Sequence, residues 1–62
     1  MNIYAYGNTI VVENAIEEIR VYNAMGSLVA TSTDANAEIS INTTGVYIVK
    51  TGNTAKRVMI ND

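Results

Sequence analysis

The sequence contains no cysteine, histidine, proline, tryptophan or phenylalanine. Without cysteine it can form neither a disulfide nor a thiolate metal site, and its redox compartment cannot be inferred. Without histidine it lacks the commonest general base and the commonest metal ligand. Glu17 and Glu18 are adjacent, so on a strand their side chains leave opposite faces and cannot act as a catalytic carboxylate pair. These absences predict a protein that is not an enzyme and holds no cofactor.

Long apolar runs and a strong charge are missing as well. The longest runs, residues 10–12 and 46–49, fall far short of the roughly 20 residues that cross a bilayer, so we expect no membrane span. A net charge of −2 provides no field for nucleic acid. Residues 1–6 lack a basic region followed by a long apolar one, so we do not expect them to form a signal peptide. If the protein is exported, we expect the signal on a parent protein outside this chain.

A chain of 62 residues has room for one hydrophobic core, which predicts a single domain over residues 1–62. The apolar residues are mainly Val, Ile and Tyr, in short runs broken by Gly, Asn, Thr and Asp, as is typical of strands. Seven strands are predicted, at residues 2–6, 9–13, 18–22, 27–32, 38–41, 46–51 and 55–60. This spacing indicates an all-β sandwich or small barrel.

Glycine positions predict the turns between these strands. Gly7 and Gly52 each precede an asparagine between two strand-like runs, the order that a two-residue type II′ hairpin requires. Gly26 closes a type I turn over residues 23–26, where a positive φ is needed. Residues 31–37 are interpreted as a crossover between sheets or a mobile loop. Residues 13–18 have the potential for a single helical turn.

Alternation assigns an inner face to most strands. The residues predicted to be buried are Ile10, Val12, Ile19, Val21, Leu28, Ala30, Ile39, Ile41, Val58 and Ile60. Residues 46–49 are apolar without alternation, so this strand is either covered on both sides or carries an apolar outer stripe. Its register stays open at this stage.

Two groups of side chains are candidates for binding. Lys50, Lys56 and Arg57 gather toward the last hairpin, where they form a possible interaction patch or keep a sheet edge soluble. The four tyrosines, at positions 4, 6, 22 and 47, would stack on ligands if they shared one face. Packing in the core or across strands explains them better, because the net charge is negative.

Two motif matches carry little weight. Residues 34–38 place oxygen ligands at alternate positions, as a calcium loop does, but the glycine expected at the sixth position is absent. Residues 42–44 match a glycosylation acceptor, which matters in a eukaryotic secretory context. No metal site and no glycosylation site is predicted.

Three segments carry a resemblance to a known family. Residues 19–29 read IRVYNAMGSLV, residues 44–50 read TGVYIVK, and residues 56–60 read KRVMI. In this order they resemble the C-terminal sorting domain of the type IX (Por) secretion system, and closely similar modules that end surface proteins of Bacteroides-type bacteria. The resemblance covers about residues 10–60. The chain differs in having no proline, where these domains usually open with Asn-Pro, and in its ending Asn61-Asp62.

The resemblance implies an immunoglobulin-like β-sandwich at the end of a larger exported protein. It implies a parent that reaches the periplasm by its own signal peptide and then the cell surface or the exterior. The implied partner is an outer-membrane secretion machine or the upstream domains of the parent. Gly45, before the Val-Tyr-Ile-Val strand, is expected to have a structural role like that of the turn glycines. A passive adhesion or interaction domain of the same fold is the alternative, and the oligomeric state stays open.

Overall fold

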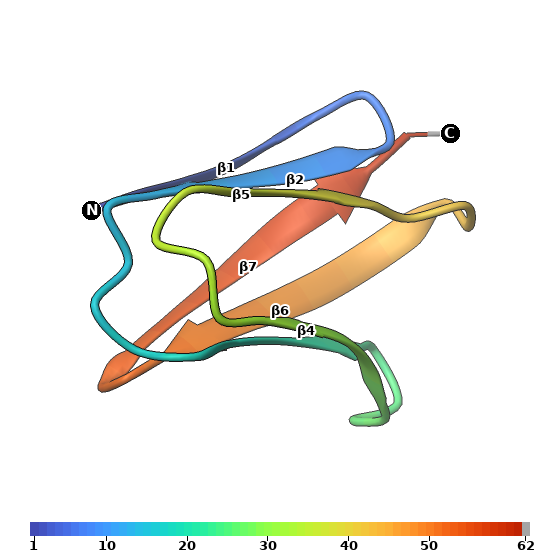
Figure 1. Ribbon diagram of the computed structural model, residues 1–62. Coiled ribbons are helices and arrows are strands. Elements are labelled where there is room, and N and C mark those ends of the chain that lie inside the picture. Colours follow the sequence, from blue (N-terminus) through green and yellow to red (C-terminus); the bar gives the residue numbers. More distant parts are fainter. Residues whose placement is uncertain (62) are drawn as a thin grey trace.

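The computed structural model describes residues 1–61, which form seven strands and no helix (Figure 1). The strands are β1 (Asn2–Tyr6), β2 (Thr9–Glu13), β3 (Ile19–Asn23), β4 (Leu28–Ser32), β5 (Ala37–Ser40), β6 (Gly45–Thr51) and β7 (Thr54–Ile60). All seven predicted strands are present, and their bounds shift by no more than one residue. The prediction of an all-β fold is confirmed.

The strands form two sheets that pack as a sandwich. One sheet has the order β1-β2-β5 and the other the order β4-β3-β6-β7, and every pair is antiparallel. Figure 1 shows them as two layers, with the start of β1 and the end of β7 at opposite ends. The chain crosses between sheets after β2, β4 and β5. In an immunoglobulin constant domain the fourth strand lies beside the fifth, whereas here β4 lies beside β3.

Two hairpins close through two-residue turns. Tyr6 pairs with Thr9 across Gly7-Asn8, and Thr51 pairs with Thr54 across Gly52-Asn53. Each glycine has a positive φ, +60° at position 7 and +56° at position 52. Among the described residues the one non-glycine with a positive φ is Asn14, so the second residue of each turn is not left-handed. A positive φ at the first position alone is the signature of a type II′ turn, as predicted.

The β3–β4 hairpin is stabilised by one asparagine side chain. Asn23 Oδ1 accepts hydrogen bonds from the backbone N–H groups of Met25 and Ser27, each at 3.0 Å. The Gly26 N–H donates to the Asn23 carbonyl at 3.0 Å, and Gly26 has a φ of +87°. This is the predicted turn with its glycine in the left-handed region. A β-branched residue at position 26 would be strained there.

A β-bulge in β4 overturns one part of the predicted core. Val21 pairs with Ala30 but Tyr22 pairs with Leu28, so Val29 is an extra residue on β4. The bulge interrupts the period of two on which the prediction for Leu28 rested. Leu28 is 54% exposed rather than buried, and Val29 is exposed beside it.

The core lies between the two sheets. Its buried apolar residues are Ile3, Ile10, Val12, Ala15, Ile19, Val21, Ala37, Ile41, Tyr47, Val49, Val58 and Ile60. Ile39, predicted to be buried, is partly exposed but packs against this cluster, as does Ala30. In β6 the side chains of Tyr47 and Val49 point inward, whereas Val46 and Ile48 are half-buried on the outside. Of the two alternatives for this strand, the apolar outer stripe is therefore the one that the structure has.

The crossover after β2 is not helical. Asn14 has a φ of +61°, which ends the strand with a left-handed residue, and the following residues form bends. Ala15 is buried, and its N–H donates to the Ala35 carbonyl at 2.8 Å in the crossover from β4 to β5. The helical turn considered for residues 13–18 is therefore wrong, because the segment turns through a left-handed Asn14 and bends instead of a helix. Residues 33–36 connect the two sheets, so the crossover interpretation of the 31–37 segment is confirmed.

Tyr47 anchors the third crossover. Its ring is buried, and its hydroxyl donates a hydrogen bond to the Thr43 carbonyl at 2.8 Å. A tyrosine whose hydroxyl bonds to the backbone a few residues upstream, at a crossover between sheets, is the tyrosine corner of β-sandwich proteins. It fixes the angle at which the chain enters β6.

Candidate functional site

The outer surface of the β4-β3-β6-β7 sheet carries cations around an apolar strip. Alternation directs one side chain in two away from the core, and the ladder aligns these side chains across four strands. We call this surface the basic face, and define it as Arg20, Tyr22, Leu28, Val46, Ile48, Lys50, Arg57 and Met59. Leu28 and Met59 are each about half exposed. Large apolar side chains that lie exposed next to one another on one surface indicate a contact surface.

A groove lies on the outer side of β3 and β6, beside the β3–β4 turn. It has a volume of about 460 Å³ and is lined by Tyr22, Asn23, Ala24, Gly26, Val46, Ile48 and Lys50. Lys50 Nζ lies 5.5 Å from the centre of the Tyr22 ring, within range of a cation–π contact. The ammonium group thus lies over the Tyr22 ring, and Lys50 lines the groove beside it.

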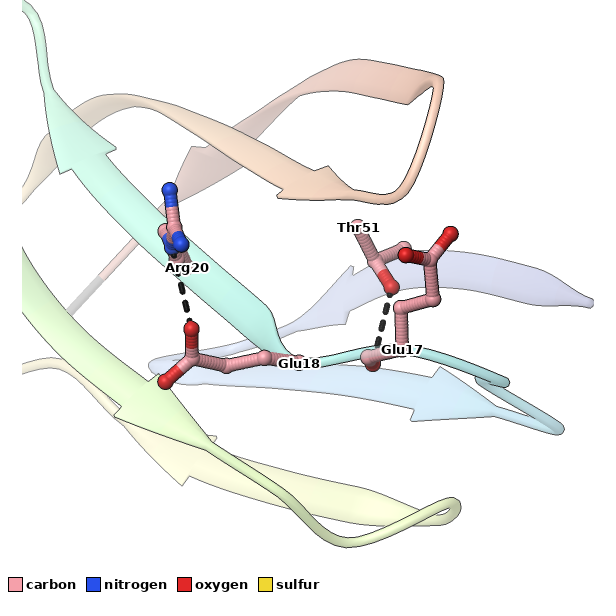
Figure 2. Close-up of polar contacts among 4 residues, drawn as sticks. All are labelled: Glu17, Glu18, Arg20 and Thr51. Carbon is pink, nitrogen blue, oxygen red and sulfur yellow. Dashed lines mark hydrogen bonds and ion pairs between the residues drawn. The ribbon is translucent and has the colours of Figure 1, made fainter.

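A third cation lies at the start of β3. Arg20 Nε donates to Glu18 Oε1 at 3.1 Å, and both side chains are about half exposed (Figure 2). The hydrogen bond with Glu18, assisted by one with Tyr22, raises the pKa of Arg20, which stays charged. Sequence reasoning missed Arg20 as part of this surface, although its alternation with Tyr22 placed both on one face.

The three cations proposed as an interaction patch do not all lie together. In the register Ile48 faces Arg57 and Lys50 faces Ala55, so Lys50 and Arg57 are diagonal neighbours on the basic face. Lys56 is opposite Val49, a core residue, and points to the other side of β7. There it lines a shallow depression with Ile3 and Tyr4 of the other sheet. The fold therefore brings together Lys50, Arg57 and Arg20 and separates Lys56 from them.

The four glycines proposed as structural residues lie at strand ends. Gly7, Gly26 and Gly52 occupy the three hairpin turns. Gly45 begins β6 with a φ of +156°, opposite Ile60. A Cβ at Gly52 would collide with the carboxylate of Glu17, whereas open space surrounds Gly7 and Gly26. That carboxylate is the flexible end of an exposed side chain and can move aside, so position 52 requires glycine for its φ of +56° rather than for space.

The outer surface of the β1-β2-β5 sheet has the opposite charge. We call it the acidic face, and define it as Tyr4, Tyr6, Val11, Glu13 and Glu38. Tyr4 and Tyr6 are exposed on neighbouring outward positions of β1, and Tyr4, Val11 and Glu38 form one cross-strand row. Glu13 accepts a hydrogen bond from the Asn2 side chain at 3.2 Å. Since Tyr22 lies on the basic face and Tyr47 in the core, the four tyrosines form no common stacking platform.

Residues 1–61 show no sign of a metal centre or a membrane helix. No group of three or more His, Cys, Asp or Glu side chains gathers among them. The same residues form no helix with the length and apolar character needed to cross a bilayer.

The sequence matches the family model of the secretion system C-terminal sorting domain over residues 5–61. That match takes in all of the chain except residues 1–4 and residue 62. The chain belongs to this family. Comparison of the sorting domain with curated proteins and with solved structures gives no match.

Membership of this family establishes the class of function. The sorting domain is a C-terminal signal module for type IX secretion, and its family is in general non-catalytic. A module of this kind interacts with secretion machinery and directs export to the exterior or the cell surface. The resemblance seen in the three sequence segments is thereby confirmed.

Proposed function

We propose that this domain ends a larger exported protein, has no catalytic activity of its own, and is recognised as a folded unit by an outer-membrane secretion machine. The parent crosses the inner membrane by its own signal peptide and meets the machine from the periplasm. The observation that carries the proposal is the basic face, an exposed apolar strip with cations at its rim on a domain of the sorting family.

Lys50 and Arg57 are the charged contacts that we assign to this recognition. Charge at the rim of an interface steers encounter and fixes orientation, while the apolar centre supplies most of the affinity. Both side chains are exposed and belong to the basic face. Lys56 was a candidate too, but it projects from the opposite side of β7, so we place it outside this contact.

A fusion experiment tests the proposal. The domain is joined to the end of a reporter with a signal peptide, and the reporter is followed in a bacterium with a working type IX system. Export of the reporter to the cell surface or medium is the expected result. The matched control is the same fusion carrying Ile19→Asp, which places a charge in the core and unfolds the signal. If the intact fusion stays in the periplasm, the sorting role is rejected and a passive interaction domain is the better account.

A further inference from the structure

We propose that this domain binds further copies of itself head to tail, with the acidic face of one copy against the basic face of the next. This association involves no secretion machinery and is a property of the domain alone. It adds a partner of defined chemistry, a second copy of this chain, to the sorting function.

The two faces are complementary in charge. On the basic face Arg20, Lys50 and Arg57 stand against the single carboxylate of Glu18, a net charge of +2 (3 − 1). On the acidic face Glu13 and Glu38 give a charge of −2, and Lys56 of β7 lines a depression with Tyr4 at the edge of this face. A positive patch that meets a negative patch favours one orientation of encounter and disfavours others.

The apolar parts of the two faces are complementary as well. The basic face has a groove whose lining includes the apolar side chains of Tyr22, Val46 and Ile48. The acidic face presents Tyr4 and Tyr6, whose rings are exposed. Exposed tyrosine rings are the side chains that serve as anchors at protein interfaces, where they fill apolar pockets on the partner. Tyr6 is 74% exposed, so burial by a partner would remove much of its surface from water.

The geometry of the sandwich excludes contact between these faces within one molecule. They are the outer surfaces of opposite sheets and point away from each other, with the core between them. Two copies cannot pair through the same face without bringing like charges together, which costs free energy. The contact must therefore join unlike faces, and such heterologous contacts continue as an open chain when they do not close into a ring.

We expect each contact to be weak. The backbone of the domain extends 27 × 21 × 15 Å along its principal axes, so one face offers an interface at the small end of the usual range. Because both sets of charges are exposed, salt will screen their attraction. Association should therefore increase with protein concentration and decrease with ionic strength.

Sedimentation velocity of the purified 62-residue chain tests the proposal. At low ionic strength the weight-average sedimentation coefficient should rise continuously with concentration beyond that of a dimer. Two double variants each reverse the charge of one face. Lys50→Glu with Arg57→Glu changes the basic face, and Glu13→Lys with Glu38→Lys changes the acidic face. Each variant alone should remain monomeric. All four side chains lie on outer faces, so we expect both variants to fold. Far-UV circular dichroism and thermal melting verify that they do. If the variant with Lys50→Glu and Arg57→Glu is unfolded, Lys50→Gln with Arg57→Gln removes the same two positive charges without adding negative ones.

An equimolar mixture of the two variants gives the sharpest result. The intact acidic face of the first fits the intact basic face of the second, and no further copy can add. The mixture should form one-to-one dimers and nothing larger. Arg57→Glu and Lys56→Glu are a matched pair on neighbouring positions. We expect the first to weaken association, because it removes a cation of the basic face, and the second not to weaken it, because Lys56 lies beside the acidic face.

Several outcomes would overturn the proposal. A native chain that stays monomeric at every concentration rejects self-association. Growth that stops at a dimer indicates an isologous contact, and a mixture that stays monomeric shows that the two faces do not bind each other. The variant with Glu13→Lys and Glu38→Lys keeps the basic face intact. It should therefore lose self-association but still export the reporter, so the two measurements test this proposal and the sorting function separately.

Discussion

The Thr51 hydroxyl donates a hydrogen bond to the Glu17 backbone carbonyl at 3.0 Å and so joins the end of β6 to the crossover before β3 (Figure 2). Thr51 is the buried polar residue of the described chain, 4% exposed. This contact fixes the crossover beside the Gly52-Asn53 turn. The same turn leads into β7, the strand that bears Arg57.

Thr51→Val should therefore destabilise the domain although it preserves shape. The substitution removes the donor to Glu17, and loss of one buried hydrogen bond costs about 1 kcal/mol. In a domain of this size that lowers the melting temperature by about 4–8 °C. Thr54→Val is the matched control, because Thr54 pairs with Thr51 across the turn but is exposed. Equal melting temperatures for Thr51→Val and the native chain would contradict this role.

Ile19→Ala should unfold a large part of the population. Ile19 is fully buried, and truncation of a buried Ile to Ala typically costs about 2–5 kcal/mol. A domain of 62 residues has a total stability of about 3–9 kcal/mol at the usual value per residue. Leu28→Ala removes a similar side chain from an exposed position and should cost less than about 1 kcal/mol. Urea denaturation measures both, and similar midpoints would show that the inner face is misassigned.

Asn23→Ala should weaken the β3–β4 hairpin. The variant leaves the N–H groups of Met25 and Ser27 without their side-chain acceptor, and we expect a loss of about 1–2 kcal/mol. Asn23→Asp retains an oxygen at the same position and should restore most of the stability. Hydrogen exchange at the two amides gives the local readout. Unchanged protection in the alanine variant would argue against the turn described above.

Calcium and zinc should leave the melting temperature unchanged at millimolar concentration. A ligand stabilises a protein in proportion to its preference for the folded state. The acidic side chains of residues 1–61 do not converge into a group of three. A rise of several degrees with either ion would require a site that this structure does not indicate.

The strands and two-residue turns could be predicted because they depend on local chemistry. Val, Ile and Tyr runs and the two Gly-Asn pairs give the seven strands almost residue by residue. Leu28 could not be predicted, since the bulge at Val29 depends on the pairing of β4 with β3. Ile39 is less buried than expected because β5 is a four-residue strand at the edge of its sheet.

The interaction surface was predicted less well than the fold. Alternation alone separates Lys56 from Arg57, because adjacent strand residues point to opposite faces. The same rule pairs Arg20 with Tyr22. What alternation cannot provide is the register between β3, β6 and β7, which places Arg20, Lys50 and Arg57 on one surface. That register results from the packing of the whole sandwich, including the inward turn of Tyr47 and Val49.

The most direct measurement compares Arg57→Gln with Lys56→Gln in the reporter fusion. The two substitutions remove the same charge at neighbouring positions of β7 but on opposite sides of the strand. The account predicts that the surface-exposed fraction of the reporter, measured by protease accessibility of intact cells, falls several-fold for Arg57→Gln and stays native for Lys56→Gln. Equal export by the two variants, or a loss confined to Lys56→Gln, would contradict recognition through the basic face.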